Sequence, residues 1–120
     1  MSIPAPEHGR VHLINIPTVE VILVNFGVDI PSGEYALTWA NVQRLRPASW
    51  QMLRAIERRN PPLNQELRMP NMTLVCLEYW SVGTQKRVLY LWWSDGVHSD
   101  GVDLFLSPYE KRAWFAFIRE

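Results

Sequence analysis

The chain has 120 residues, of which 48% are apolar and 20% charged, so its length and composition exclude an intrinsically disordered protein and favour one compact domain. Twelve basic and twelve acidic residues cancel, which excludes a general electrostatic attraction to nucleic acid, and a single cysteine excludes an internal disulfide or a thiolate metal cluster. No stretch has the length of a membrane span or the pattern of a secretion signal. We therefore expect a cytoplasmic protein, or one inside a host cell if the chain is a viral or phage factor or an effector.

The first ten residues contain Pro4, Pro6 and Gly9 and have no apolar periodicity. We expect residues 1–10 to form a flexible leader. A single domain then covers residues 11–120.

Two strands are predicted near the start of the domain, at residues 11–16 and 19–26, because β-branched residues dominate both stretches. Pro17 and Thr18 separate them. The two stretches are therefore expected to form a hairpin or one bent strand.

The next 35 or so residues have the signals of helices. Thr38 is a candidate cap for a short helix over residues 38–45. Pro47 suits the first turn of a longer amphipathic helix, which continues to Arg59 and ends at the Asn60-Pro61 pair.

Three further strands are predicted at residues 72–80, 86–94 and 102–107. Gly83 supplies the turn between the first two. An antiparallel meander is the simplest arrangement of these three strands.

The last segment contains a capping-box pattern, with Ser107 as the cap, Pro108 at the first helical position and Glu110 three residues after the cap. This pattern predicts a C-terminal helix that begins at Ser107. The element order ββαβββα then predicts an α+β fold, with a single mostly antiparallel sheet of about five strands and two main helices packed on one face.

Large apolar side chains are predicted on both faces of the strand at residues 86–94, and around more than one side of the C-terminal helix. Either the core is rich in tryptophan or some of these aromatic residues contact another protein. The second interpretation predicts a non-enzymatic interaction module that forms a homodimer and binds a further protein. The residues expected to bind the partner are Trp92, Trp93, Tyr109, Trp114, Phe115 and Ile118.

Five arginines lie between residues 44 and 59, against Glu57 as the sole acid. They favour either a solvated helix face or, as an alternative function, a nucleic-acid-binding accessory protein, because guanidinium groups bind phosphates in fork geometry. The residues that would contact phosphate are Arg44, Arg46, Arg54, Arg58 and Arg59.

The tripeptide Asp-Gly-Val occurs twice between residues 95 and 102, with a histidine between the copies. A hairpin loop with His98 exposed near its tip is the favoured interpretation. A weaker alternative is a metal-dependent hydrolase centred on Asp95, His98 and Asp100, although calcium-loop spacing is absent. We expect no catalytic residue, no resident metal and no cofactor, with Cys76 as a buried apolar side chain.

Overall fold

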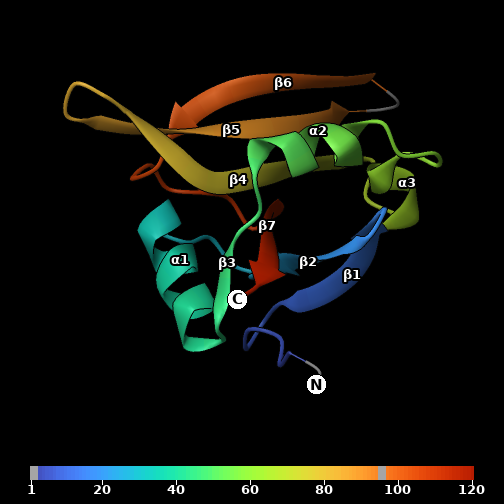
Figure 1. The fold of residues 1–120 in the computed structure, drawn as a ribbon, viewed down its shortest axis with the longest axis horizontal. Coiled ribbons are helices and arrows are strands. Elements are labelled where there is room, and N and C mark those ends of the chain that lie inside the picture. The colour runs from blue at the N-terminus through green and yellow to red at the C-terminus, as the bar shows by residue number, and fades with distance from the viewer. Residues whose placement is uncertain (1–2, 95–96) are drawn as a thin grey trace.

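The computed structural model describes residues 3–94 and 97–120, which form seven strands and three helices around one sheet (Figure 1). The strands are β1 (Arg10–Ile16), β2 (Val19–Asn25), β3 (Leu45–Pro47), β4 (Asn71–Val82), β5 (Gln85–Ser94), β6 (Val97–Leu104) and β7 (Ala113–Arg119). The helices are α1 (Gly33–Val42), α2 (Trp50–Glu57) and α3 (Leu63–Glu66).

The strand order across the sheet is β1-β2-β7-β4-β5-β6, and β3 pairs with β7 beside β4. β1 and β2 form an antiparallel hairpin, which was one of the two arrangements expected of them. β4, β5 and β6 form the predicted antiparallel meander, although β6 spans Val97–Leu104 and not residues 102–107. β7 joins the two halves, because it is antiparallel to β2 and β3 and parallel to β4. The fold is broadly α+β, but the predicted strand number and order were wrong.

The predicted C-terminal helix is wrong, because residues 113–119 form the central strand β7. Six consecutive residues of β7 are buried, and a continuous apolar run suits a strand whose two faces are both covered. Ser107 does not cap a helix: its hydroxyl donates to the carbonyl of Leu104 at 2.8 Å. Residues 107–112 are therefore a connection that leads the chain into β7.

The predicted helix boundaries also need correction. α1 begins at Gly33, five residues before Thr38, and the hydroxyl of Ser32 caps it by accepting from the amide of Tyr35. Pro47 pairs with Phe117 as part of β3, and α2 starts later, where the hydroxyl of Ser49 accepts from the amide of Met52.

Helices cover both faces of the sheet, whereas the sequence predicted that they pack on one face. We call the face under α2 and α3 face A and the face under α1 face B. The core on face A includes Leu23, Leu53, Ile56, Leu74, Leu91 and Trp114, and the core on face B includes Val24, Ala36, Ala40, Val75, Phe115 and Phe117. This arrangement explains why the inner strands are apolar on both sides without a partner molecule.

Residues 3–9 precede β1 and contact the β2 end of the first hairpin. Pro6 is buried and accepts a hydrogen bond from the amide of Gly9 at 3.0 Å. A Cβ atom at Gly9 would lie 1.9 Å from the carbonyl oxygen of Asn25, so only glycine fits there. The flexibility expected of residues 1–10 stays a prediction. No helix among the residues described has the length and apolar character that crossing a membrane requires.

Candidate functional site

The side chains predicted to bind a partner lie mostly inside the protein. Trp93, Trp114, Phe115 and Ile118 belong to the two cores, with exposed fractions of 3%, 1%, 1% and 8%. Tyr109 is also buried and Trp92 is partly buried. Most of the aromatic residues predicted to bind a partner are therefore accounted for by packing within one chain.

Three other aromatic side chains are exposed close to one another in the fold. Trp50 in the first turn of α2 is 51% exposed, and Tyr79 and Trp80 near the end of β4 are each 42% exposed. The sequence signal for this site is weak: it is the break in apolar alternation at Glu78 and the position of Trp50 directly after the helix cap.

The end of β4 that contains Tyr79 and Trp80 leaves the body of the sheet. β4 pairs with β7 over Thr73–Val75, and beyond Val75 no other strand in the described part of the chain pairs with β4 on that side. Toward β5 the register shifts between Cys76 and Trp80, which marks a β-bulge. β4 thus keeps a free backbone edge, and its hairpin with β5 extends from the sheet at the upper left of Figure 1.

Two hollows of about 480 and 500 Å³ adjoin this edge, and both are lined by Glu78 and Tyr79. We call them together the β4 groove. Its other lining residues are Leu37, Arg46, Pro47, Ser49, Trp50, Met52, Arg54, Leu77, Trp80, Leu89 and Ile118. One anchor of the groove is the thiol of Cys76, which donates to the carbonyl of Ala48 at 3.0 Å and holds the segment before α2 beside β4.

The charged groups at the β4 groove are unequally neutralised. Arg54 Nη1 lies 2.6 Å from Asp100 Oδ2 and 3.2 Å from Glu57 Oε1, and these hydrogen bonds raise the pKa of Arg54 above its ordinary value. Lys86 Nζ lies 4.7 Å from the centre of the Tyr79 ring. Within residues 3–94 and 97–120, no carboxylate forms an ion pair with Lys86 or Arg46. Of the two, Arg46 lines the groove and is available to a ligand, whereas Lys86 lies over the rings of Tyr79 and Phe105.

The predicted arginine patch is divided by ion pairs that point in different directions. Arg54 contacts Asp100 on β6, whereas Arg59 contacts Glu66 on α3. Arg44, Arg46 and Arg58 are exposed. Phosphate binding by all five arginines together stays a prediction, and two of the five would first have to leave their carboxylates.

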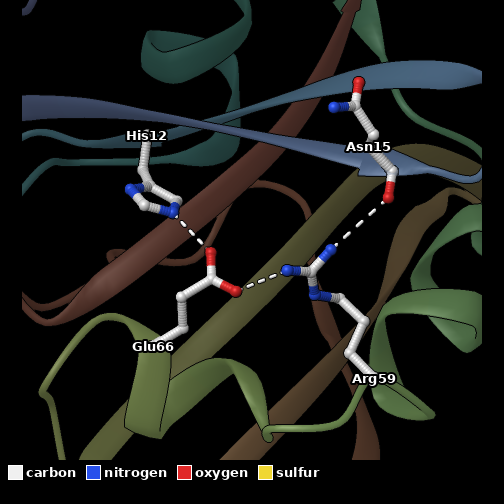
Figure 2. Close-up of polar contacts among 4 residues, drawn as sticks. All are labelled: His12, Asn15, Arg59 and Glu66. Carbon is white, nitrogen blue, oxygen red and sulfur yellow. Dashed lines mark hydrogen bonds and ion pairs between the residues drawn. The ribbon is translucent and has the colours of Figure 1, made fainter.

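Glu66 lies between His12 and Arg59, as Figure 2 shows. His12 Nε2 donates to Glu66 Oε2 at 2.6 Å, and the Arg59 guanidinium contacts Oε1 and donates to the backbone carbonyl of Asn15 at 3.4 Å. Burial alone would raise the pKa of Glu66, but these hydrogen bonds outweigh burial and lower it. Both carboxylate oxygens are occupied by donors, so the cluster joins β1 to α3 and suits a structural role.

The second Asp-Gly-Val copy was predicted to lie in a hairpin loop, but it belongs to strand β6. Asp95 and Gly96 lie outside the described residues, but β6 already begins at Val97, and His98 and Asp100 are strand residues on face A. Their contacts are with α2: His98 Nε2 lies 3.5 Å from Glu57, and Asp100 pairs with Arg54. No group of three or more His, Cys, Asp or Glu side chains in the part of the chain covered by the structure is placed to hold a metal ion.

Cys76 is buried, as predicted from its apolar surroundings. Burial raises the pKa of its thiol to about 11. A neutral thiol bonded to a backbone carbonyl has the character of a packing residue and not of an activated nucleophile.

Comparison of the chain with protein-family models, curated proteins and solved structures finds no significant match.

Proposed function

We propose that the protein is a non-enzymatic interaction module that binds an extended segment of a partner protein in the β4 groove. The observation that carries this proposal is the free edge of β4 beside two hollows and three exposed aromatic side chains.

A free strand edge presents unpaired backbone donors and acceptors, which an extended peptide can satisfy by adding as a further strand. In this binding mode the backbone hydrogen bonds supply affinity, and alternate side chains of the peptide enter pockets beside the edge. The bulge at residues 77–79 turns the edge away from β5 and limits the added strand to a short segment.

The lining of the groove indicates which peptide side chains would bind. Trp50, Trp80 and Leu89 form an apolar hollow that suits a large aliphatic or aromatic side chain. Arg46 favours acidic residues in the peptide, placed away from the exposed carboxylate of Glu78. The expected ligand is thus a short extended segment that combines an apolar anchor with flanking acidic residues.

The proposal is tested by selecting peptides from a random displayed library against the whole protein and measuring their affinity by fluorescence anisotropy. Replacing Trp80 or Trp50 with alanine should weaken the selected peptides by at least about tenfold, because aromatic anchors dominate such interfaces. Tyr35→Ala is the matched control, since Tyr35 is an equally exposed aromatic residue on α1. Failure to select any peptide, or equal affinity for all three variants, would contradict the proposal.

Strand addition has a sharper signature than aromatic burial. Methylating the peptide amides one at a time should weaken binding at alternate positions, because every second amide of an added strand donates to the edge. Uniform tolerance of amide methylation would exclude strand addition, even if an aromatic hollow is occupied.

The homodimer expected from the sequence stays part of the proposal, with a different basis. Most of the aromatic residues that motivated it are buried, so we place the dimer contact at the β4 groove of each copy, where aromatic side chains and a strand edge are exposed. Light scattering over a wide concentration range decides this point: a constant monomer mass removes the homodimer and leaves the peptide-binding proposal in place.

A further inference from the structure

A hollow of about 690 Å³ opens on face B of β4, β5 and β6, separate from the β4 groove. Its volume is within the usual range of small-ligand pockets. The residues that matter for its chemistry are Tyr90, Trp92, Asp103, Tyr109, Glu110 and Arg112.

The floor of this hollow is formed by Tyr90 and Trp92, which lie two residues apart on β5 and therefore point to the same face. Gly101 on β6 is opposite Tyr90. A Cβ atom at Gly101 would lie 2.5 Å from the Tyr90 hydroxyl and 2.6 Å from the ring carbon that bears it. The Tyr90 ring thus extends across β6 over the glycine, and the sheet presents a broad aromatic surface.

The wall opposite this floor is the segment before β7, and it is held in place by hydrogen bonds. The Tyr109 hydroxyl donates to the carbonyl of Leu104 at 3.0 Å, and the Tyr109 backbone pairs with Ile30. The side-chain amide of Asn25 donates to the carbonyls of Lys111 and Ala113 at 2.8 and 2.9 Å. The wall is therefore formed before any ligand binds.

Carboxylates outnumber cations among the side chains of the hollow. Asp103 lies on face B, since it pairs with the face B core residue Val88, and its Oδ1 accepts from the amide of Leu104 at 2.7 Å. Neither Asp103 nor Glu110 forms an ion pair with a basic side chain of the residues described. Against these two charges the lining contains the single cation Arg112, so the site has a net negative charge.

From this combination we infer that the hollow binds an organic cation of the alkylated ammonium class, carried by a small molecule or by a peptide side chain. The faces of Tyr and Trp rings attract cations through their quadrupoles, and an adjacent carboxylate adds a direct charge. An anionic ligand would be repelled by Asp103 and Glu110. This hollow is independent of the β4 groove. The groove lies at the edge of β4 and is lined by other aromatic residues.

The test is a titration of the ¹⁵N-labelled whole protein with tetramethylammonium, followed by NMR of the tryptophan indole signals. The indole of Trp92, identified by its loss in Trp92→Phe, should shift saturably at millimolar concentration. Equal concentrations of sodium or of a neutral sugar should leave it unchanged. Absence of a saturable shift, or an equal response to the sugar, would overturn the inference.

Charge variants then test the role of the carboxylates. Asp103→Asn and Glu110→Gln should each weaken tetramethylammonium binding by about threefold or more, because each removes one nearby attraction. Glu7→Gln is the matched control, since Glu7 is an exposed carboxylate that does not line the hollow. Asp103 also accepts a hydrogen bond from the amide of Leu104, so Asp103→Asn can disturb the fold. In that case the affinity of Glu110→Gln alone decides the test. Unchanged affinity in Glu110→Gln and in a folded Asp103→Asn would contradict the inference.

A second titration separates the two sources of such a cation. Choline and a peptide that contains trimethyl-lysine are compared at equal concentration in the same NMR experiment. Tighter binding of choline indicates a small-molecule ligand, and tighter binding of the peptide indicates a modified protein. A response to neither, with tetramethylammonium also inactive, overturns the inference.

Discussion

His12 on β1 and Glu66 on α3 are hydrogen-bonded, with 2.6 Å between Nε2 and Oε2, and Arg59 contacts the other oxygen of the same carboxylate (Figure 2). The three residues connect the first hairpin to the segment that follows α2. A carboxylate that joins two elements in this way makes their association depend on its ionisation.

Replacing Glu66 with glutamine should lower the free energy of unfolding at pH 7 by about 1–2 kcal/mol, because charge-assisted hydrogen bonds are lost. The folded state lowers the pKa of Glu66 below its ordinary value of 4.5. Its contribution is therefore present above that value and is lost as the pH falls through the folded-state pKa. Urea denaturation at pH 7 and pH 3 checks this: the gap between wild type and Glu66→Gln should shrink at pH 3. The exposed Glu7→Gln should show no such gap at either pH.

Phe115→Ala should destabilise the protein by about 3–5 kcal/mol, because it removes a buried ring from the centre of β7 and leaves a cavity. Trp50→Ala, at a half-exposed position, should cost less than about 1 kcal/mol. Chemical denaturation of both variants gives the comparison. An unchanged stability together with a smaller assembly mass in solution would mean that Phe115 lies at an interface between molecules. The placement of β7 in the core would then be wrong.

Ser49→Ala should destabilise the protein by about 1 kcal/mol, since the hydroxyl of Ser49 accepts from the first turn of α2. Thr38→Ala is the matched control. Thr38 is an exposed residue inside α1, where alanine has the higher helix propensity, so this change should be neutral or slightly stabilising. Thermal unfolding of the two variants checks the corrected helix starts, and a larger loss at Thr38 would contradict them.

Cys76 should resist alkylation by iodoacetamide in the native protein and react at the normal rate in urea, because the buried thiol stays protonated. Burial raises its pKa from 9.0 to about 11. The stability from the neutral thiol is thus fully present below pH 9 and is lost as the pH rises toward 11, by at most about 2–3 kcal/mol. Cys76→Ala removes this dependence, so its unfolding free energy should fall less steeply than that of wild type between pH 9 and 11. Parallel curves would show that the thiol is not the cause.

The sequence allowed the hairpin β1–β2 and the meander β4–β5–β6 to be predicted, because each pairs stretches that are close along the chain and separated by a turn. The helix predicted for residues 113–119 was wrong for a physical reason. A short run of buried apolar residues looks the same in a helix and in a central strand, and Ser107-Pro108 resembles a helix start. What decides between them is the pairing of β7 with β2 and β4, which no local pattern contains.

The candidate sites were harder to predict than the fold. Trp92 and Tyr109 were predicted as binding residues, and both line the hollow on face B. The prediction for Tyr109, Trp114, Phe115 and Ile118 assumed a C-terminal helix, whereas the last three lie in the buried strand β7. Trp80 was not selected, because its exposure follows from the divergence of β4 from β7 after Val75. Exposure of this kind is a property of the assembled sheet.

The central place of β7 has a consequence for how the protein is made in the cell. The hairpin β1–β2 and the meander β4–β5–β6 leave the ribosome well before Ala113–Arg119, yet it is this last strand that lies between them. Until it emerges, the inner edges of β2 and β4 stay open to other nascent chains. The sheet can therefore close only after Ala113–Arg119 has been translated, and the edges of β2 and β4 are most open to wrong pairing in the interval before closure.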